Sequence, residues 1–350
     1  MNIGSGANTY EWQGSWAKIP ESPSAGSGWA HHGVVVTEAG QVVTYHPGDP
    51  TMMLLDSQGE LVRSWPVEIS DAHGLTLVKE GDQEVLWVAD NGRKRQASLG
   101  YGYPDDEVRG QVLKMDLHGN TLMSIDRPDL DVYREGIYSP TFVVVNEERH
   151  GGNGDVWVAD GYGQSYVHRY DKSGNYVSSI NGEEGQGRFN CPHAIFVDRR
   201  RSGPELYVAD RANGRVQVYD MAGSFLRSFG TDFLTTPSGF VTHGDLLVIA
   251  ELRARLTVCD ANDRFVCYLG ANEPVCEVEG WPNNQDSDGK LVSTSLLEPG
   301  KFNSPHGMAV DADGNLYVAE WLIGGRFTRL GKLPSSRDCS SAMVAQIERN

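Results

Sequence analysis

Histidine recurs at one position of a short motif that appears six times along this chain of 350 residues. The six copies open as HHGVVV (31 to 36), AHGLTL (72 to 77), SPTFVVV (139 to 145), CPHAIFV (191 to 197), TPSGFV (236 to 241) and SPHGMAV (304 to 310). The shared position is occupied by His32, His73, Thr141, His193, Ser238 and His306. Three imidazoles that converge can bind a transition metal and leave one coordination position open. For any one histidine alone, the ordinary alternative is a turn residue whose ring bonds a loop carbonyl.

The segments that follow each copy indicate which elements position these histidines. A second apolar run comes next, as in EVLWVAD (84 to 90) and ELYVAD (205 to 210), and a third run often ends in an Asp and a turn, as in VHRYDKSGN (167 to 175). Four short strands in a unit of roughly 40 to 50 residues are typical of a β-propeller blade. We therefore predict an all-β, six-bladed β-propeller that forms a single domain over residues 1–350, with blades starting near residues 31, 72, 139, 191, 236 and 304.

This architecture predicts where the shared position lies in space. The first strand of each propeller blade is innermost, so the residues at its start surround one mouth of the central channel. Blades two, four and six carry His73, His193 and His306 there, in an arrangement close to threefold. The sequence therefore predicts a metal site at the channel mouth, with zinc as the expected metal.

Three segments fall outside the regular repeat. The last unit lacks a fourth strand after RFTRLGKL (326 to 333), and YEWQGSWAKI (10 to 19) is an unassigned strand-like segment. We predict that residues 10–19 complete the last blade and close the ring, which removes a long unpaired edge. Residues 93–110 and 271–302 are insertions, each of which is either a lid over the site or a surface decoration.

Composition excludes several classes of partner. The net charge of −17 opposes binding to nucleic acid or to anionic membranes, and no apolar run of about 18 residues is present. The N-terminus lacks a basic flank followed by an apolar core, so we expect a cytoplasmic protein with a small-molecule substrate; the oligomeric state stays open. Five cysteines without CxxC spacing favour reduced thiols, whereas a Cys267–Cys276 disulfide is the alternative for a secreted protein.

Several motifs resemble a known enzyme family. The repeat resembles the NHL repeat, and AHGL, SPTFVVV, VADGYGQS, QGRFNCPHAIFVD, VADRANGRVQVYD and FNSPHGMAVD are similar to segments of the peptidyl-α-hydroxyglycine α-amidating lyase family. The resemblance implies that His73, His193 and His306 are zinc ligands. It implies that Tyr162 of DGYG is the catalytic tyrosine and that Arg211 of ADRANGR lies in the substrate pocket. Enzymes of that family cleave the C–N bond of an N-acylated α-hydroxyglycine to give an amide and glyoxylate.

Other interpretations of the same residues stay open. Tyr162 is otherwise an aromatic residue that packs at the blade rim, and Arg211 is otherwise part of an ion pair between blades. The recurrent Asp90, Asp160 and Asp210 are expected to be structural, each accepting hydrogen bonds from backbone N–H groups of a turn.

The chain departs from the family pattern at three positions. Pro47 stands where the family has an arginine that acts with the tyrosine. Either another cation, such as Arg211 or a residue of RKRQ (93 to 96), performs the role of that arginine, or the substrate lacks the group that the arginine binds. Gly307 replaces an Asp ligand of a structural calcium, so we expect calcium to bind weakly or not at all. His32 is a fourth metal ligand, a general acid, or a channel-lining residue; as a ligand it favours iron or copper over zinc.

These observations lead to one main hypothesis and two alternatives. The main hypothesis is a metal-dependent carbon–nitrogen lyase in which Tyr162, Arg211 and His32 act beside a metal held by His73, His193 and His306. The first alternative is a metal-dependent hydrolase such as a lactonase on the same scaffold. The second is a non-catalytic NHL module that presents its rim to a partner.

Overall fold

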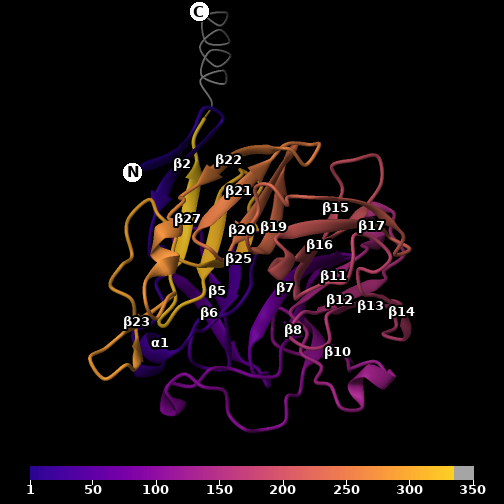
Figure 1. The fold of residues 1–350 in the computed structure, drawn as a ribbon, viewed down its shortest axis with the longest axis horizontal. Helices are drawn as coiled ribbons and strands as arrows, with labels where there is room; N and C mark the ends of the chain where they lie inside the picture. The colour runs from indigo at the N-terminus through magenta and orange to yellow at the C-terminus, as the bar shows by residue number, and fades with distance from the viewer. Residues whose placement is uncertain (335–350) are drawn as a thin grey trace, which may run out of the picture.

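The computed structural model describes residues 1–334, and six antiparallel sheets in it form a ring (Figure 1). The innermost strands contact one another in the order β3, β7, β11, β15, β19, β25 and back to β3. The first blade contains β3 (Val34–Val36), β4 (Val42–Tyr45), β5 (Thr51–Leu55) and β6 (Leu61–Pro66). The second contains β7 (Ala72–Glu80), β8 (Gln83–Asp90), β9 (Gln111–Asp116) and β10 (Thr121–Ile125). The third contains β11 (Phe142–Val145), β12 (Val156–Asp160), β13 (Tyr166–Tyr170) and β14 (Tyr176–Ile180).

The remaining blades continue the same antiparallel order. The fourth contains β15 (Pro192–Asp198), β16 (Glu205–Asp210), β17 (Arg215–Asp220) and β18 (Phe225–Phe229). The fifth contains β19 (Pro237–His243), β20 (Leu246–Glu251), β21 (Arg255–Cys259) and β22 (Phe265–Leu269). The sixth combines β25 (Pro305–Val310), β26 (Leu316–Glu320) and β27 (Phe327–Lys332) with β2 (Asn8–Gln13) and β1 (Asn2–Ser5) from the other end of the chain. The six-bladed propeller predicted from the repeat is confirmed.

The ring is closed by pairing between the two ends of the described chain. Strand β2 pairs with β27, with Tyr10 opposite Lys332 and Trp12 opposite Leu330, and β1 adds a fifth strand outside it. The predicted closure by an N-terminal strand is therefore confirmed, although the strand ends at Gln13 and residues 14–19 continue outside it. Joining the first and last segments in one sheet removes the open edge that a six-bladed ring otherwise leaves.

Turn chemistry and interblade packing explain why the repeat folds in this way. In the hairpin between β13 and β14, one carboxylate oxygen of Asp171 accepts the backbone N–H groups of Ser173 and Asn175, and Gly174 adopts a φ of 85°. That backbone conformation is easily adopted only by glycine. Apolar side chains from facing sheets fill the space between blades, and Trp157 is fully buried between the third and fourth. Burial of this alternating apolar set fixes the register of each strand.

The predicted structural role of the recurrent aspartates is confirmed. Asp90 accepts the N–H groups of Ser70 and Asp71 at the start of its own blade. Asp160 accepts the N–H of Ser139, and Asp210 accepts the N–H of Asn190; these equivalent contacts belong to the third and fourth blades. Each carboxylate thereby ties the loop that precedes the inner strand to the end of the second strand.

Short helices and one small hairpin lie in the loops that connect the strands. They are α1 (Pro23–Ser27) and five 3-10 turns: η1 (Ala97–Leu99), η2 (Asp131–Tyr133), η3 (Glu148–His150), η4 (Arg211–Asn213) and η5 (Glu273–Glu277). The 93–110 segment contains η1 but no strand, whereas the 271–302 segment contains η5 and the hairpin of β23 (Asn284–Gln285) and β24 (Leu291–Val292). Among the helices within residues 1–334, none is long and apolar enough to cross a bilayer.

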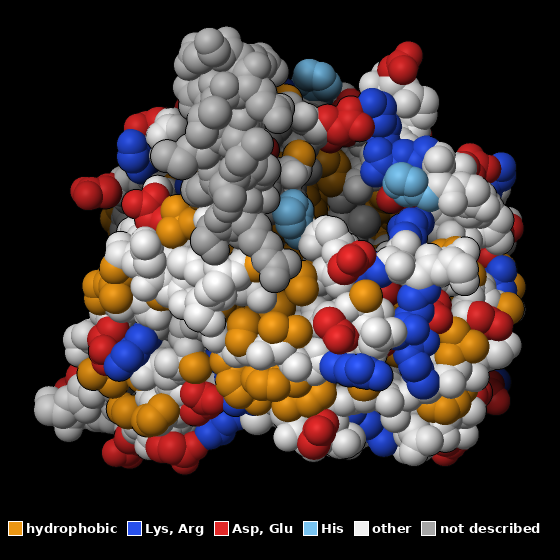
Figure 2. Space-filling view, turned by 90° about the horizontal axis from the view of Figure 1, so that it is seen from above, with side chains coloured by type: hydrophobic (Ala, Val, Ile, Leu, Met, Phe, Trp, Pro, Cys, Tyr) orange, Lys and Arg blue, Asp and Glu red, His pale blue; other side chains and the backbone are white. Residues whose placement is uncertain are grey.

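The propeller ring also encloses an apolar cavity away from these loops. Its volume is about 300 Å³, and its lining includes Val35, Leu77, Phe142, Phe196 and Met308 from the inner strands. The space-filling view onto one end of the molecule shows a hollow with hydrophobic side chains inside it (Figure 2).

Candidate metal centre

Backbone irregularities at the starts of the inner strands position three histidines. The pairing of β7 with β8 shifts register between Ala72 and Gly74, at His73. The same shift occurs between Pro305 and Gly307, at His306, and between Pro192 and Ile195, a stretch that contains His193. A β-bulge adds a residue to one strand and redirects its side chain. The fifth blade has the same shift between Pro237 and Gly239, so the shift belongs to the shared position of the motif, which holds a histidine in three of these four blades.

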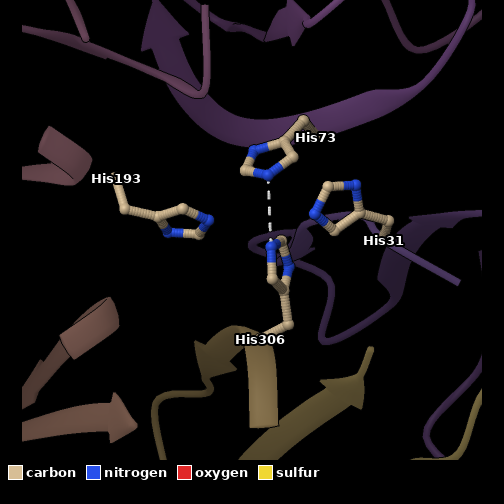
Figure 3. A group of neighbouring side chains, drawn as sticks. All are labelled: His31, His73, His193 and His306. Atoms are coloured by element: carbon tan, nitrogen blue, oxygen red, sulfur yellow. Dashed lines mark hydrogen bonds between the residues drawn. The ribbon is translucent and has the colours of Figure 1, made fainter. Parts of the chain in front are cut away.

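Four imidazoles meet at the mouth of the channel. His31, His73, His193 and His306 are all buried or nearly so, and one nitrogen from each lies within 4.8 Å of the nitrogens of the others (Figure 3). The Nε2 atoms of His73 and His306 are 3.2 Å apart. The structure thus brings together the three histidines that the repeat indicated, and the fourth ring comes from His31.

Contacts to backbone carbonyls orient two of these rings. The Nδ1 of His73 lies 2.6 Å from the carbonyl oxygen of Thr141, and the Nδ1 of His193 lies 2.9 Å from that of Ser238. An Nδ1–H that donates to a carbonyl leaves the Nε2 lone pair free to bind a metal. The carbonyl of His32 occupies the equivalent place near His306. Burial lowers the pKa of His306, and this carbonyl opposes part of that shift, although the contact lies outside normal hydrogen-bond geometry.

The Nδ1 side of His31 faces a carboxylate instead. Its Nδ1 lies 3.3 Å from one oxygen of Asp71, and the other oxygen of Asp71 lies 2.9 Å from Nζ of Lys94. Burial raises the pKa of Asp71, and Lys94 opposes that shift. Asp71 is fully buried, so the contact with Lys94 compensates a carboxylate that is removed from water.

The donor set fits a transition metal. Neighbouring ligands of tetrahedral zinc, each about 2.05 Å from the ion, are separated by about 3.3 Å. The observed 3.2 Å between His73 and His306 is close to that value. Burial is the main cause that lowers the pKa of all four imidazoles, to about 4 for His306, and Arg211 lowers each further. The rings are therefore neutral at pH 7, which is the form that binds a metal.

Tyr162 contacts three of the four histidines. Its hydroxyl lies 3.0 Å from Nε2 of His31, 3.2 Å from Nε2 of His73 and 3.0 Å from Nε2 of His193. The loop that carries Tyr162 is held by Asp160, whose carboxylate accepts the N–H of Gln164. Burial raises the pKa of Tyr162, and the Arg211 guanidinium opposes that effect. The aromatic residue of DGYG therefore lies inside the histidine cluster.

Arg211 completes this group as a nearby cation. Its Nη1 donates to the Tyr162 hydroxyl at 3.2 Å, and the guanidinium lies 5.3 Å from the centre of the tyrosine ring. Within residues 1–334, no carboxylate lies within 4.0 Å of this side chain. The interblade ion pair that was the alternative for Arg211 is thus absent from the described residues. The positive charge is available to an anionic ligand beside the histidines.

The sequence indicated His32, and not His31, as the histidine of the first blade beside the site. In the structure His31 takes that place, and His32 lies outside the cluster. The ring of His32 packs against Phe327 at 5.4 Å and Tyr45 at 6.0 Å, and its buried Nε2 makes no hydrogen bond within the described residues. The His32 backbone instead matches Thr141 and Ser238, which offer carbonyls to a histidine of the preceding blade. Strand β3 begins at Val34, so His31 and His32 both lie in the loop that precedes it. In the sequence, the adjacent pair His31–His32 was the feature that could have indicated His31 as a second candidate.

The other two departures from the family pattern have local explanations. A Cβ at Gly307 would lie 2.3 Å from the carbonyl oxygen of His32, so a side chain at this position collides with the first blade. Pro47 lies in the turn after β4, where Nδ1 of His46 accepts the N–H groups of Gly48 and Asp49. A Cβ at Gly28 would meet the backbone of Pro47 at 2.3 Å. Gly307 and Pro47 therefore both lie where two backbone segments are in close contact. That calcium binds weakly or not at all stays a prediction.

The cysteines in the described residues are free thiols. Cys191, Cys259, Cys267 and Cys276 form no disulfide, and Cys339 lies outside the described residues. The alternative Cys267–Cys276 pair is therefore not formed.

Comparisons with known proteins place the chain among NHL propellers. No family model matches the chain. It is similar to human NHL repeat-containing protein 3, with 25% identity over 61% of this chain and 58% of that protein. It is also similar to a probable peptidyl-α-hydroxyglycine α-amidating lyase of Caenorhabditis elegans, with 27% identity over 71% of this chain and 60% of that protein. The chain thus spans less than two thirds of either relative.

A solved structure shares the fold. A streptogramin B lyase superposes with a TM-score of 0.56 at 14% identity, covering 94% of this chain and 100% of that one. With the repeat, the ring closure and the sequence relatives taken together, the chain is an NHL-repeat six-bladed propeller that is distantly related to NHL repeat-containing protein 3 and to peptidyl-α-hydroxyglycine α-amidating lyase domains.

Proposed function

We propose that this protein is a metal-dependent carbon–nitrogen lyase that cleaves an N-acylated α-hydroxyglycine or a related N-substituted α-hydroxy acid. The observation that carries the proposal is the convergence of four neutral imidazoles with the hydroxyl of Tyr162 and the unpaired guanidinium of Arg211. The distant relationship to amidating lyases supports the same reaction class.

His73, His193 and His306 would hold the metal, and His31 is a fourth donor within reach. When bound, a transition metal supplies Lewis acidity that lowers the pKa of a substrate hydroxyl. Zinc suits three imidazoles with an open position, whereas iron or copper suits a set in which His31 also binds. Imidazoles without a carboxylate are a poor ligand set for calcium, which disfavours a calcium-dependent hydrolase.

The proposed roles of Tyr162 and Arg211 follow from their positions. Arg211 holds the substrate carboxylate through charge-assisted hydrogen bonds, which places the carbinol carbon beside the histidines. Tyr162, as the phenolate, accepts the proton of the carbinol hydroxyl and returns a proton to the departing amide nitrogen. Arg211 stabilises that phenolate because its guanidinium donates to the phenol oxygen.

The reaction balances without water. The carbinol O–H loses its proton, the C–O bond becomes a carbonyl, the C–N bond breaks, and the nitrogen gains a proton. The products are a primary amide and glyoxylate. Because the Tyr162 hydroxyl contacts three of the imidazoles, it is placed to reach a hydroxyl bound at their centre.

The proposal is tested by incubating zinc-loaded protein with α-hydroxyhippurate or ureidoglycolate. We expect glyoxylate together with one equivalent of benzamide or urea. Protein in which His193 is replaced by alanine is the matched control, because it lacks one of the proposed ligands. If metal is bound but neither substrate yields glyoxylate, this reaction is excluded.

A further inference from the structure

A cavity with a cationic lining lies beside the histidine cluster. Its volume is about 810 Å³, and Arg93, Lys94 and Arg95 of the 93–110 segment line it, opposite Ser27 of α1 and Gly48 of the first blade. The same segment also contributes Asp106, Glu107 and Arg109 to the lining, so cationic side chains outnumber carboxylates there. Lys94 connects the two sites, since its Nζ bonds Asp71 at 2.9 Å and Asp71 lies 3.3 Å from Nδ1 of His31. The cavity therefore adjoins the cluster through Lys94 and Asp71.

Aromatic faces fix the guanidinium groups of two of these residues. The guanidinium carbons of Arg93 and Arg95 each lie 4.7 Å from the centre of the Tyr103 ring, and Arg95 also lies 4.9 Å from the centre of Trp29. The Nη1 of Arg95 donates to the carbonyl of Tyr101 at 2.8 Å. These contacts hold both guanidinium planes and reduce the conformational entropy that a ligand must remove on binding.

These two guanidinium groups lack a counter-ion within the protein. In the described part of the chain, no carboxylate lies within 4.0 Å of Arg93 or Arg95, and the Nε atom of each is buried without a hydrogen-bond partner. By contrast, Lys94 is paired with Asp71, and Arg109 lies 3.6 Å from Glu107. Partly buried, uncompensated cations are costly, and in a chain of net charge −17 they mark a place for an anion.

We propose that Arg93 and Arg95 form a subsite for a carboxylate at the far end of the substrate's acyl group. This inference rests on the proposed lyase function and specifies its substrate as an N-acyl-α-hydroxyglycine whose acyl chain ends in a carboxylate. The carboxylate next to the carbinol carbon is served by Arg211, which contacts Tyr162 inside the cluster. Arg93 and Arg95 lie in the neighbouring cavity, so they reach a second carboxylate and not the first.

Two inert analogues that differ in one group test the subsite. N-succinylglycine and N-butyrylglycine have acyl chains of equal length, but a terminal carboxylate replaces a methyl group in the first. Calorimetric titration of the zinc-loaded full chain should show N-succinylglycine binding about tenfold or more tightly, since a charge-assisted hydrogen bond contributes about 1.5–3 kcal/mol. Equal affinities in the wild-type protein would overturn the proposal without any variant.

Two variants test whether Arg93 and Arg95 cause the preference for N-succinylglycine. The double variant Arg93→Gln with Arg95→Gln should bind both analogues alike and retain the wild-type zinc content. The control is Arg134→Gln, because Arg134 directly follows η2, its side chain is 78% exposed, and it does not line the cavity. The control should keep the preference for N-succinylglycine. A preference that survives in a folded double variant would overturn the assignment.

Different experimental results would contradict the proposed subsite and the proposed lyase reaction. If N-succinyl-α-hydroxyglycine gives no glyoxylate but the arginine-dependent preference is measured, the lyase reaction is wrong and the anion subsite stands. If glyoxylate forms equally fast from the succinyl and butyryl substrates at limiting concentration and the analogues bind alike, the subsite is wrong and the lyase stands.

Discussion

The Nε2 atoms of His73 and His306 lie 3.2 Å apart, and the Nδ1 of His73 is already engaged by the carbonyl of Thr141. Without a metal, His306 carries its proton on Nε2 and donates it to Nε2 of His73; with a cation between the rings, both Nε2 lone pairs point at the cation. This relationship motivates the first prediction.

We expect the purified protein to bind one transition-metal ion per chain and to gain thermal stability from it. A ligand at 1,000 times its Kd stabilises the folded state by about 4 kcal/mol. Replacing His193 with alanine should abolish stoichiometric binding, whereas His118→Ala, at an exposed loop position, should not change it. Elemental analysis and thermal unfolding with and without added zinc provide the measurement. Retention of one ion per chain in the His193 variant would show that His193 is not a required ligand, and retention in the double variant His73→Ala with His193→Ala would exclude this site.

The neighbours His31 and His32 should differ in their effects on the metal. Because His31 contributes to the cluster and His32 packs against Phe327, His31→Gln should change the visible spectrum of the cobalt-substituted protein. His32→Gln should leave that spectrum unchanged and lower the unfolding temperature instead, since it alters a fully buried side chain. The reverse pattern would show that His32 is the residue beside the metal.

Tyr162→Phe should retain metal and lose catalysis. The substitution removes only the hydroxyl that contacts His31, His73 and His193. General acid–base catalysis contributes about 10²–10⁴-fold, so kcat for glyoxylate release should fall by that factor at unchanged zinc content. An unchanged kcat would remove Tyr162 from the proton transfer.

Arg211→Met should reduce the recognition of the substrate carboxylate. Wild-type protein should prefer α-hydroxyhippurate over its methyl ester by about ten- to a hundredfold in kcat/KM, because a charge-assisted hydrogen bond contributes about 1.5–3 kcal/mol. The variant should lose this preference, since Arg211 has no carboxylate partner in the described residues that could mask its role. If the acid and the ester still differ equally, another cation binds the carboxylate.

A buried histidine outside the site should make the fold sensitive to acid. His168 bonds Tyr133 and Ser179, and burial lowers its pKa to about 3. In the unfolded chain, the imidazole of His168 is protonated below about pH 6.5. The contribution of His168 to the free energy of unfolding is therefore fully present above about pH 6.5 and falls by up to about 1.4 kcal/mol per pH unit as the pH drops toward 3.

To test this prediction, the free energy of unfolding in urea is measured for the wild type and for His168→Gln between about pH 7 and pH 4.5. Asp160 shares the Tyr133 hydroxyl, and burial raises its pKa to about 6, so its own contribution to stability changes with pH in the opposite direction. The difference between wild type and variant therefore isolates His168. That difference should shrink as the pH falls; a constant difference would contradict the prediction.

Much of the site was predictable because a repeat converts sequence spacing into spatial proximity. His73, His193 and His306 occupy equivalent positions in alternate units, and any closed ring of six such units brings them to one mouth. The fold followed from the strand and turn pattern for the same reason. The register shifts at the start of β7 and β25, in contrast, have no pattern in the sequence that predicts them.

The sequence by itself determined the propeller, its closure by an N-terminal strand, and three of the four clustered imidazoles. Tertiary structure alone decided that His31 and not His32 joins them, because both residues lie in the loop before β3, where no strand alternation determines which side chain faces the channel. It also decided that Arg93 and Arg95 stack on Tyr103 beside the site, since no periodic pattern governs the 93–110 segment and tertiary contacts, including Arg95 with Trp29 and Lys94 with Asp71, place it.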